Sequence, residues 1–434
     1  MDRNSLERLS KQELVEIVLK LQRPSKTSKT SSKPPSTDKK ARREQSRPGG
    51  AKPGHQGHSR TLHDAPDETV DHRPEVCPQC SAALDAHLAA DVLGEYDEID
   101  LPPIAPFVRR HRRLRVCCPQ CRARVKGALP PAATGSPFGP RLHALVLYLK
   151  TFQAVSYVRL AGMLDEVFGL KVSQGALSNM LKRSHQPFST AKLEIIDTLR
   201  QADVVASDET GIRIEGSNGY HWVFRSSQAI VHEAQLSRAA QVVRDVMGEH
   251  RPKIWLSDGY SAQQKHGHHH QTCLAHLARD VAYGVDASQD KLPFQLKLWL
   301  DRVFALAREV TTFAASTIKG KKRELERNLA ELLGTPSTCL ISEKLRGKMA
   351  RASPKLLTFL DFPGEVEVTN NGCERALRPA VIQRKVTNGF RSNWAAQGDC
   401  AVRSVTDTAK LSGSSAWMTI NQTLARDAHS QNGG

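Results

Sequence analysis

The sequence predicts a multidomain α/β protein. The chain has 434 residues, more than one hydrophobic core usually serves, so two or more domains are expected. Strand patterns alternate with helix patterns in its middle, and its excess positive charge is confined to two stretches. Apolar residues make up 39 % of the chain and aromatic residues 5 %, which is typical of a protein that buries a sizeable core.

The apolar runs are too short for membrane insertion. The stretch from Ala144 to Leu149 falls far below the roughly 18 residues that a membrane-spanning helix needs. The start, MDRNSLERLS, has no apolar segment like that of a signal peptide. We therefore expect a cytoplasmic protein without a membrane partner.

The positive charge is localised. The formal net charge is +17, and residues 23–60 hold 11 Lys or Arg against 2 Asp or Glu, while residues 106–127 hold 8 and none. Localised positive charge indicates a polyanion partner, most commonly nucleic acid. The alternative is a solvated basic tail without a partner.

The N-terminal residues 1–22 carry leucines at steps of three and four and predict a short amphipathic helix, with Ser10 and Glu13 as a candidate capping box. This helix is too short for a stable coiled coil alone, although two copies could pair. Residues 23–60 are rich in Ser, Thr, Lys, Pro and Gly. They predict a disordered basic linker.

Residues 61–130 hold two Cys-Pro-Gln-Cys motifs. Cys77 and Cys80 form the first, and Cys118 and Cys121 the second. Four thiolates in two such pairs suit one closed, tetrahedral zinc site. Nine cysteines without a secretory signal favour free thiols or metal ligation over disulfides. We expect a zinc-binding module, with reduced cysteines lacking metal as the alternative.

The second motif carries one ambiguity, because Cys117 could replace Cys118 as a ligand. It is also surrounded by arginines, which suggests that the zinc supports a phosphate-contacting surface. These arginines are Arg109, Arg110, Arg112, Arg113, Arg115, Arg122 and Arg124.

Residues 138–200 are helical by pattern. One helix ends at Gly169, Ser173 caps the next, and a further helix is expected after Pro187. Helix, turn and capped helix is the outline of a DNA-reading helix-turn-helix. A plain helical hairpin fits the same pattern.

Residues 201–290 are rich in strand patterns. Three successive strands, a helix and a fourth strand are predicted, over residues 202–214, 219–226, 229–235, 237–250 and 253–259. This is the opening order of a ribonuclease-H-like α/β core. Residues 291–362 have a helical period and are interpreted as a helical insertion. The core then resumes over residues 363–415, and residues 416–434 form a C-terminal tail.

Three acids stand where a catalytic site is expected. Asp208 and Asp258 fall at the ends of apolar strands, where α/β sheets place ligand-binding groups. Glu374 lies in the first turns of a helix that Pro379 is expected to stop. Two aspartates and a glutamate can hold two hard divalent ions about 3.5 to 4 Å apart, as phosphodiester displacement requires. Taken alone, each acid is an ordinary turn or surface residue. The strand order and the basic segments upstream favour a shared catalytic role for the three.

Two features near the three acids, Glu209 and a group of histidines, are expected to contribute less to catalysis. Glu209 should lie on the opposite side of the strand from Asp208, so we expect its substitution to cost little. His266, His268, His269 and His270 could bind a transition metal, but a solvated loop is the favoured interpretation.

Several stretches together resemble a known family. They are, in chain order, SSKPPSTDKK, KPGHQGH, the paired CPQC motifs, SDETGIRIEGSNGYHWVF, LSDGYSAQ, CLAHLARD and NNGCERALRP. This set is similar to the signature stretches of the insertion-sequence-66 family of bacterial DDE transposases. The resemblance runs from about residue 25 to 410.

The resemblance implies a ribonuclease-H-like catalytic core, with a helical insertion between the second and third acids and a zinc-binding domain upstream. It maps the catalytic triad to Asp208, Asp258 and Glu374, with two Mg²⁺ or Mn²⁺ ions. Cys273 and His276 resemble a Cys-x-x-His that follows the second acid in several such families and are candidate auxiliary residues. The alternative is a helix whose cysteine packs and whose histidine faces solvent.

The function implied is metal-dependent cleavage of DNA at the ends of an insertion sequence, followed by strand transfer. The expected partners are double-stranded DNA, as terminal inverted repeats and target, and further copies of the chain in a synaptic complex at the bacterial nucleoid. One alternative is a catalytically inactive, zinc-containing DNA-binding regulator or a transposition-defective relic. Another is a ribonuclease-H-like nuclease that does not join strands.

Overall fold

The computed structural model describes residues 10–21, 24–27, 29–30, 54–57, 60–102, 104–129 and 136–430. The chain divides into two units, one of Met1–Lys39 with Val108–Gly434 and one of Lys40–Phe107. The predictions for residues 1–9, for most of the linker and for residues 431–434 lie outside the described residues. Within the described ranges, no helix is long and apolar enough to cross a membrane.

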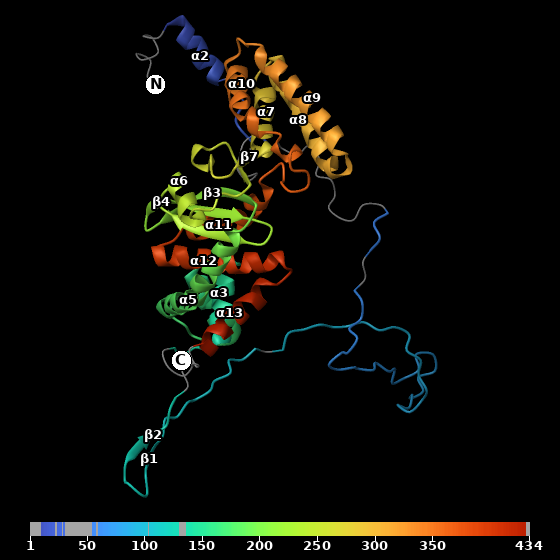
Figure 1. The fold of residues 1–434 in the computed structure, drawn as a ribbon. Helices are drawn as coiled ribbons and strands as arrows, with labels where there is room; N and C mark the ends of the chain where they lie inside the picture. The colour runs from blue at the N-terminus through green and yellow to red at the C-terminus, as the bar shows by residue number, and fades with distance from the viewer. Residues whose placement is uncertain are drawn as a thin grey trace. The chain divides into compact units, whose positions relative to one another are not determined.

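A five-stranded mixed sheet forms the centre of the larger unit, in the order β5-β4-β3-β6-β7 (Figure 1). Strands β3 (Val204–Ile214), β4 (Ser217–Arg225) and β5 (Ile230–Gln235) run antiparallel, while β6 (Ile254–Ser257) and β7 (His269–Thr272) run parallel to β3. The first four strands match the sequence prediction. The fifth corrects it, because the histidine-rich segment forms β7 at the sheet edge rather than a solvated loop.

Both faces of the sheet are covered. Side chains alternate between the faces along a strand, and Val205, Trp222 and Trp255 pack on one face with α6 (Ala240–Met247). Ala206 and Leu256 pack on the other face, with α7 (Leu274–Ala287). The apolar alternation read from the sequence therefore fixes which face each strand residue occupies.

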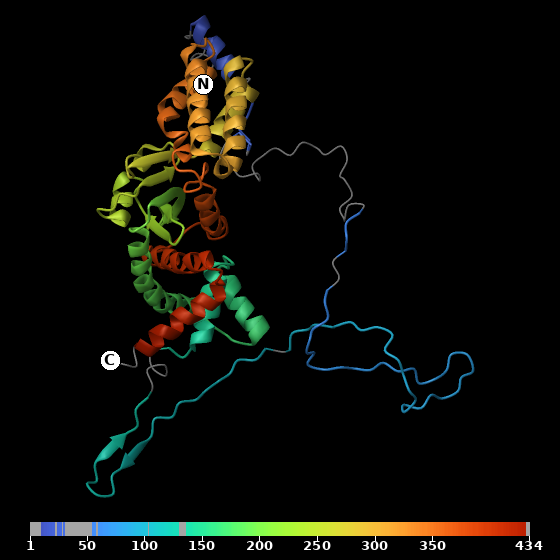
Figure 2. The same ribbon diagram turned by 45° about the vertical axis from the view of Figure 1, so that its right-hand side comes forward.

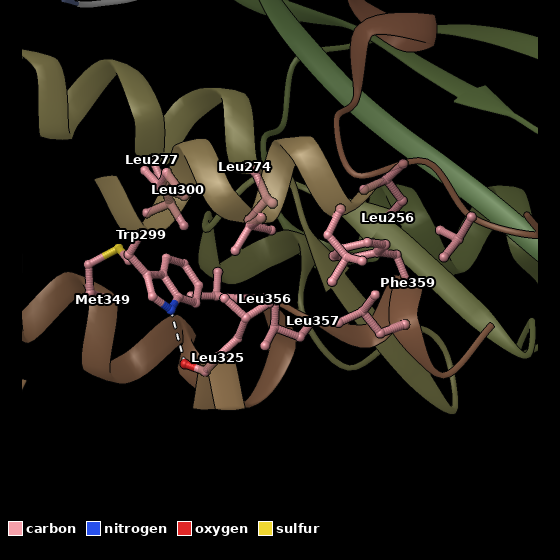
Figure 3. Close-up of a cluster of buried hydrophobic side chains, with 14 of the residues drawn as sticks. Leu256, Leu274, Leu277, Trp299, Leu300, Leu325, Met349, Leu356, Leu357 and Phe359 are labelled. Carbon is pink, nitrogen blue, oxygen red and sulfur yellow. Dashed lines mark hydrogen bonds between the residues drawn. The ribbon is translucent and has the colours of Figure 1, made fainter. Parts of the chain in front are cut away.

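The buried side chains of the helical insertion and those on the second face of the sheet form one continuous hydrophobic core. The insertion consists of α8 (Lys291–Glu309), α9 (Ala315–Gly334) and α10 (Leu340–Ala352), and a short 3₁₀ turn joins α8 to α9. In Figure 3, the ring of Trp299 lies beside Met349, and its Nε1 donates to the carbonyl of Leu325 at 2.9 Å. Because the buried indole N–H has a partner, this large ring is buried without a polar penalty.

Three helices precede the sheet: α3 (Pro140–Thr151), α4 (Tyr157–Phe168) and α5 (Gln174–Leu199). Gly169 ends α4 with φ of 62°, and the Ser173 side chain accepts from the N–H at the start of α5, both as predicted. The predicted break at Pro187 is wrong, because α5 runs through it. Proline removes one backbone hydrogen bond, while Leu181 and Phe188 on either side are buried in one cluster.

The last part of the chain is also helical, with α11 (Asn371–Thr387), α12 (Asn393–Leu411) and α13 (Ala416–Ser430). Pro379 lies inside α11 and does not stop it, since Leu377 and Ala380 are buried around it. The residues expected to form a tail instead form α13 up to residue 430. α12 packs against β5 and α5, and Figure 2 shows it at one end of the sheet, with α8 and α9 beyond the other end.

Near the N-terminus, α2 (Lys11–Leu21) begins with the predicted capping box. The backbone N–H of Ser10 donates to Glu13 Oε2 at 2.7 Å, and the N–H of Glu13 donates to Ser10 Oγ at 3.2 Å. Each residue satisfies a backbone donor that the first helical turn leaves free.

Candidate active site

Asp208 and Asp258 lie at the same level on neighbouring parallel strands. The β3–β6 register pairs Ala206 with Leu256, and each aspartate follows two residues later, so both return to the face of that pair. One expectation is corrected here. Asp208 is not the end of β3, which continues to Ile214 in a hairpin with β4. It lies where the pairing with β6 has ended.

Glu374 comes to these aspartates from the first turn of α11. Its carboxylate lies 3.4 Å from Arg279 and 3.8 Å from Nε2 of His276, and its side chain is 30 % exposed. The positive end of the helix dipole also favours a carboxylate at this position. The sequence analysis did not identify Arg279, although it lies one helical turn after His276.

A buried asparagine ties the acid-bearing segments together. Asn370 precedes α11, and its Nδ2 donates to the carbonyl of Ser207, next to Asp208. Its backbone N–H donates to Cys273 Sγ at 3.1 Å. The N–H of Cys273 in turn donates to the carbonyl of Ser257 at the end of β6. The ends of β6, α7 and α11 are therefore bonded to one another beside Asp208.

The Cys-x-x-His pair takes part in this arrangement. His276 Nδ1 lies 3.4 Å from Cys273 Sγ, and its side chain is only 24 % exposed. Burial lowers the pKa of His276, while Asp258 and Glu374 oppose that shift. The interpretation as a solvent-facing histidine is therefore wrong. No sequence signal identified Asn370, because its role depends on contacts with residues far away in the chain.

The carboxylates interact strongly. Burial, and then the charges of Glu209, Asp258 and Glu374, raise the pKa of Asp208 to about 8. As the chain stands, no three His, Cys, Asp or Glu side chains among the described residues are arranged to hold a metal ion. The donor set nevertheless suits one, because oxygen ligands with crowded negative charge are what a hard divalent cation requires.

Glu209 lies on the other face of β3, as predicted, but it is not a tolerant position. Its side chain is 2 % exposed and 2.6 Å from Arg238, and its second oxygen accepts from Gln263 at 2.6 Å. Removing one partner of such a pair leaves a charge poorly compensated. We therefore expect substitution here to cost folding stability, while its smaller effect on catalysis stays a prediction.

A comparison with protein families bears directly on these residues. The model described as the IS66 family of transposases matches residues 135–398, which span α3 to α5, both aspartates and Glu374. The chain belongs to the IS66 transposase family. No curated protein matches it.

The two cysteine motifs of this IS66-family transposase form the same turn. In each, the carbonyl of the first cysteine accepts from the residue four positions on: Ser81 to Cys77 and Arg122 to Cys118, both at 2.9 Å. Those donors have φ of 58° and 57°. The match places Cys118 in register with Cys77, whereas Cys117 ends strand β1 (Arg115–Cys117). This resolves the ambiguity in favour of Cys118.

Each motif also stabilises a thiolate. Backbone N–H groups within the motif lower the pKa of Cys77 and of Cys118, and the thiolate is the form that binds zinc. Each motif is described within its own unit. The zinc site therefore stays a prediction.

The arginines around the second motif are exposed in the IS66-family chain. Several flank or belong to a two-stranded hairpin of β1 and β2 (Arg124–Lys126), in which Arg115 pairs with Lys126. Every residue of both strands is exposed. Contact of this basic hairpin with DNA phosphates stays a prediction.

Proposed function

We propose that this IS66-family transposase cleaves DNA at the ends of its own element and joins the 3′-hydroxyls to a target. Asp208, Asp258 and Glu374 are the proposed ligands of two Mg²⁺ or Mn²⁺ ions. The observation that carries the proposal is that Asp208 and Asp258 lie at the same level on neighbouring parallel strands. Glu374 reaches them from α11, a helix that packs against β3.

The proposed core is ribonuclease-H-like. Support comes from the strand order, with three antiparallel strands followed by two strands parallel to the first. Support also comes from the position of the helical insertion, between Asp258 and Glu374 in the chain.

The chain's own groups have distinct parts in this proposal. Asp208 gives up its proton to become a ligand, since its pKa of about 8 reflects negative charge that a cation would compensate. Arg279 and His276 orient Glu374, and Asn370 holds α11 against β3. When bound, two divalent ions supply activation of water or a 3′-hydroxyl and stabilisation of the leaving oxygen.

The upstream parts of the chain are proposed to bind DNA. Cys77, Cys80, Cys118 and Cys121 would hold one structural zinc, which would brace a hairpin too small to fold by burial alone. The exposed arginines beside it would contact phosphates, α4 and α5 would contact the terminal repeats, and copies of the chain would assemble on paired ends.

The test is an end-cleavage and strand-transfer assay on DNA carrying the element's own ends, with Mg²⁺ or Mn²⁺. Asp208→Asn, Asp258→Asn and Glu374→Gln keep the shape of each side chain and remove its charge. Each should abolish both reactions while end binding survives. Asp301→Asn, at an exposed position on α8, removes the same charge away from the proposed DNA contacts and should retain activity.

Full activity of Glu374→Gln would identify a different third acid, with Glu365 or Glu367 next in the chain. Cleavage without joining would support a nuclease. A wild-type chain that binds the ends and cleaves with neither metal would favour the regulator or relic.

A further inference from the structure

A pocket of about 280 Å³ opens beside the free edge of β3, away from the three acids. It exists because β3 is longer than its neighbour. Pairing with β6 covers only Val204 to Ala206. The next residues of β3 have β4 on one side and side chains of α11 on the other, and the backbone of Phe390 pairs with Arg213 and Glu215 at the far end. The residues that line the pocket are Gly211, Ile212, Arg213, Asn218, Gly219, Tyr220 and Arg384.

Two guanidinium groups hold fixed positions at this pocket. Arg384, from α11, donates to the carbonyl of Gly211. Arg213 donates to Asn218 Oδ1 at 2.9 Å across the hairpin. None of the lining residues is acidic. The pocket therefore presents positive charge and planar donors, a combination that suits a phosphate oxygen.

An aromatic strip runs from the pocket along the Glu209 face of β3 to the segment that follows Asp258. The β3–β4 register places Tyr220 opposite Gly211. The guanidinium of Arg238 lies 5.9 Å from the ring of Tyr220 and 3.8 Å over the ring of Tyr260. The N–H of Tyr260 donates to Asp258 Oδ1 at 2.8 Å. Rings and a stacked arginine are the groups on which nucleotide bases and sugars pack.

The distance between the pocket and the three acids corresponds to a few nucleotides of DNA. Gly211 follows Asp208 by three residues, or about 10 Å along a strand. Arg384 follows Glu374 by ten residues, or about 15 Å along a helix. One strand of DNA rises about 3.4 Å per nucleotide along the helix axis. Backbone phosphates lie farther apart than this rise, so the pocket lies within about four nucleotides of the acids.

We propose that this pocket binds a backbone phosphate of the DNA strand within about four nucleotides of the bond that is cut. Arg213 and Arg384 hold the phosphodiester, and Tyr220 and Arg238 pack against the nucleotides between it and the acids. The position of the cut rests on the proposed function. The aromatic strip favours a nucleic acid strand over free phosphate or an acidic peptide.

The test measures DNA binding by full-length Asp208→Asn protein, which holds the substrate without turnover. Fluorescence anisotropy on the element's ends is followed across salt concentration. Adding Arg213→Gln should weaken binding about tenfold and lower the salt slope by about one, and Arg213→Lys should recover most of the loss. Arg327→Gln, at an exposed position on α9, should leave the slope unchanged if the effect is specific to the pocket.

Neutral methylphosphonate linkages locate the contact. One such linkage within about four nucleotides of the cleavage point should weaken binding by the Asp208→Asn protein that keeps Arg213 and have little effect on the protein that also carries Arg213→Gln. An unchanged slope, together with equal sensitivity of both proteins at every linkage, would overturn the proposal. The proposal would also be overturned if Arg213→Gln reduced only the competition by inorganic phosphate and left DNA binding unchanged. Cleavage by the wild-type chain tests the proposed function separately, because these binding measurements need no turnover.

Discussion

The pKa of Asp208 has a direct consequence for folding stability. Burial and the neighbouring carboxylates raise that pKa from 3.8 to about 8. Between these values, the folded protein keeps the Asp208 proton while the unfolded chain has lost it. The contribution of Asp208 to wild-type stability therefore falls as pH rises from about 4 to about 8, and is constant above. Asp208→Asn cannot ionise, so it should gain stability over wild type across the same window.

The size of the gain follows from the shift. One pKa unit corresponds to about 1.4 kcal/mol, so four units set a ceiling of about 6 kcal/mol. Asp208 is only partly buried, and solvent relaxation reduces this value. We expect about 2 kcal/mol at pH 9 and about a third of that at pH 5, where roughly a third of the window has been crossed. For a chain of this size, 2 kcal/mol raises the unfolding midpoint by about 2 °C.

The assay is thermal unfolding of both proteins from pH 5 to pH 9 without added divalent cation, with Asp301→Asn as the control for surface charge. Adding Mn²⁺ at pH 8 should then stabilise wild type and have little effect on Asp208→Asn, because binding to the native state shifts the equilibrium. A gain that is equal at both ends of the pH range, or absent at pH 9, would refute the electrostatic reasoning.

Four further outcomes are expected. Purified protein should carry about one zinc per chain by metal analysis, and Cys80→Ser should release it and loosen residues 76–129; freshly reduced protein without zinc would contradict the site. Deleting residues 23–60 should flatten the salt dependence of DNA binding, measured by anisotropy, whereas an unchanged slope would place the DNA elsewhere. Asn370→Ala should lower the unfolding midpoint by several degrees, since it removes a buried hydrogen bond worth about 1 to 3 kcal/mol, and should reduce cleavage more than end binding. Glu209→Gln should destabilise the chain by about 1 to 3 kcal/mol in chemical denaturation, and a neutral result would show that Gln263 alone holds this face.

The sequence predicted what depends on local pattern. The strands that carry Asp208 and Asp258 have strong apolar alternation, and the start of α11 is preceded by polar residues that favour a helix N-terminus. Strand β7 was missed because its residues, His269 to Thr272, include no aliphatic side chain. It forms because the buried neighbour β6 offers its free edge for hydrogen bonds.

Proline and contacts between distant residues account for the other differences. Pro187 and Pro379 were expected to end helices, but burial on both sides of each outweighs one lost hydrogen bond. Asn370 and Arg279 escaped notice because their partners are distant in sequence, such as Cys273, which is 97 residues from Asn370. Such roles appear only once the fold brings these segments together.

The core around α3 to α5 is completed by residues from the far end of the chain. Leu147 and Leu181 share one buried cluster with Val402 on α12 and Ile420 on α13. During synthesis, at about 5 to 20 residues per second, the apolar face of α3 to α5 therefore stays exposed for roughly 10 to 50 seconds, until α12 and α13 have been synthesised. A chain cut short before α12 would lose this core as well as the end of the sheet domain. Release of the whole chain from the ribosome is thus the step that makes the protein competent, and premature termination should yield an aggregation-prone fragment rather than a smaller working protein.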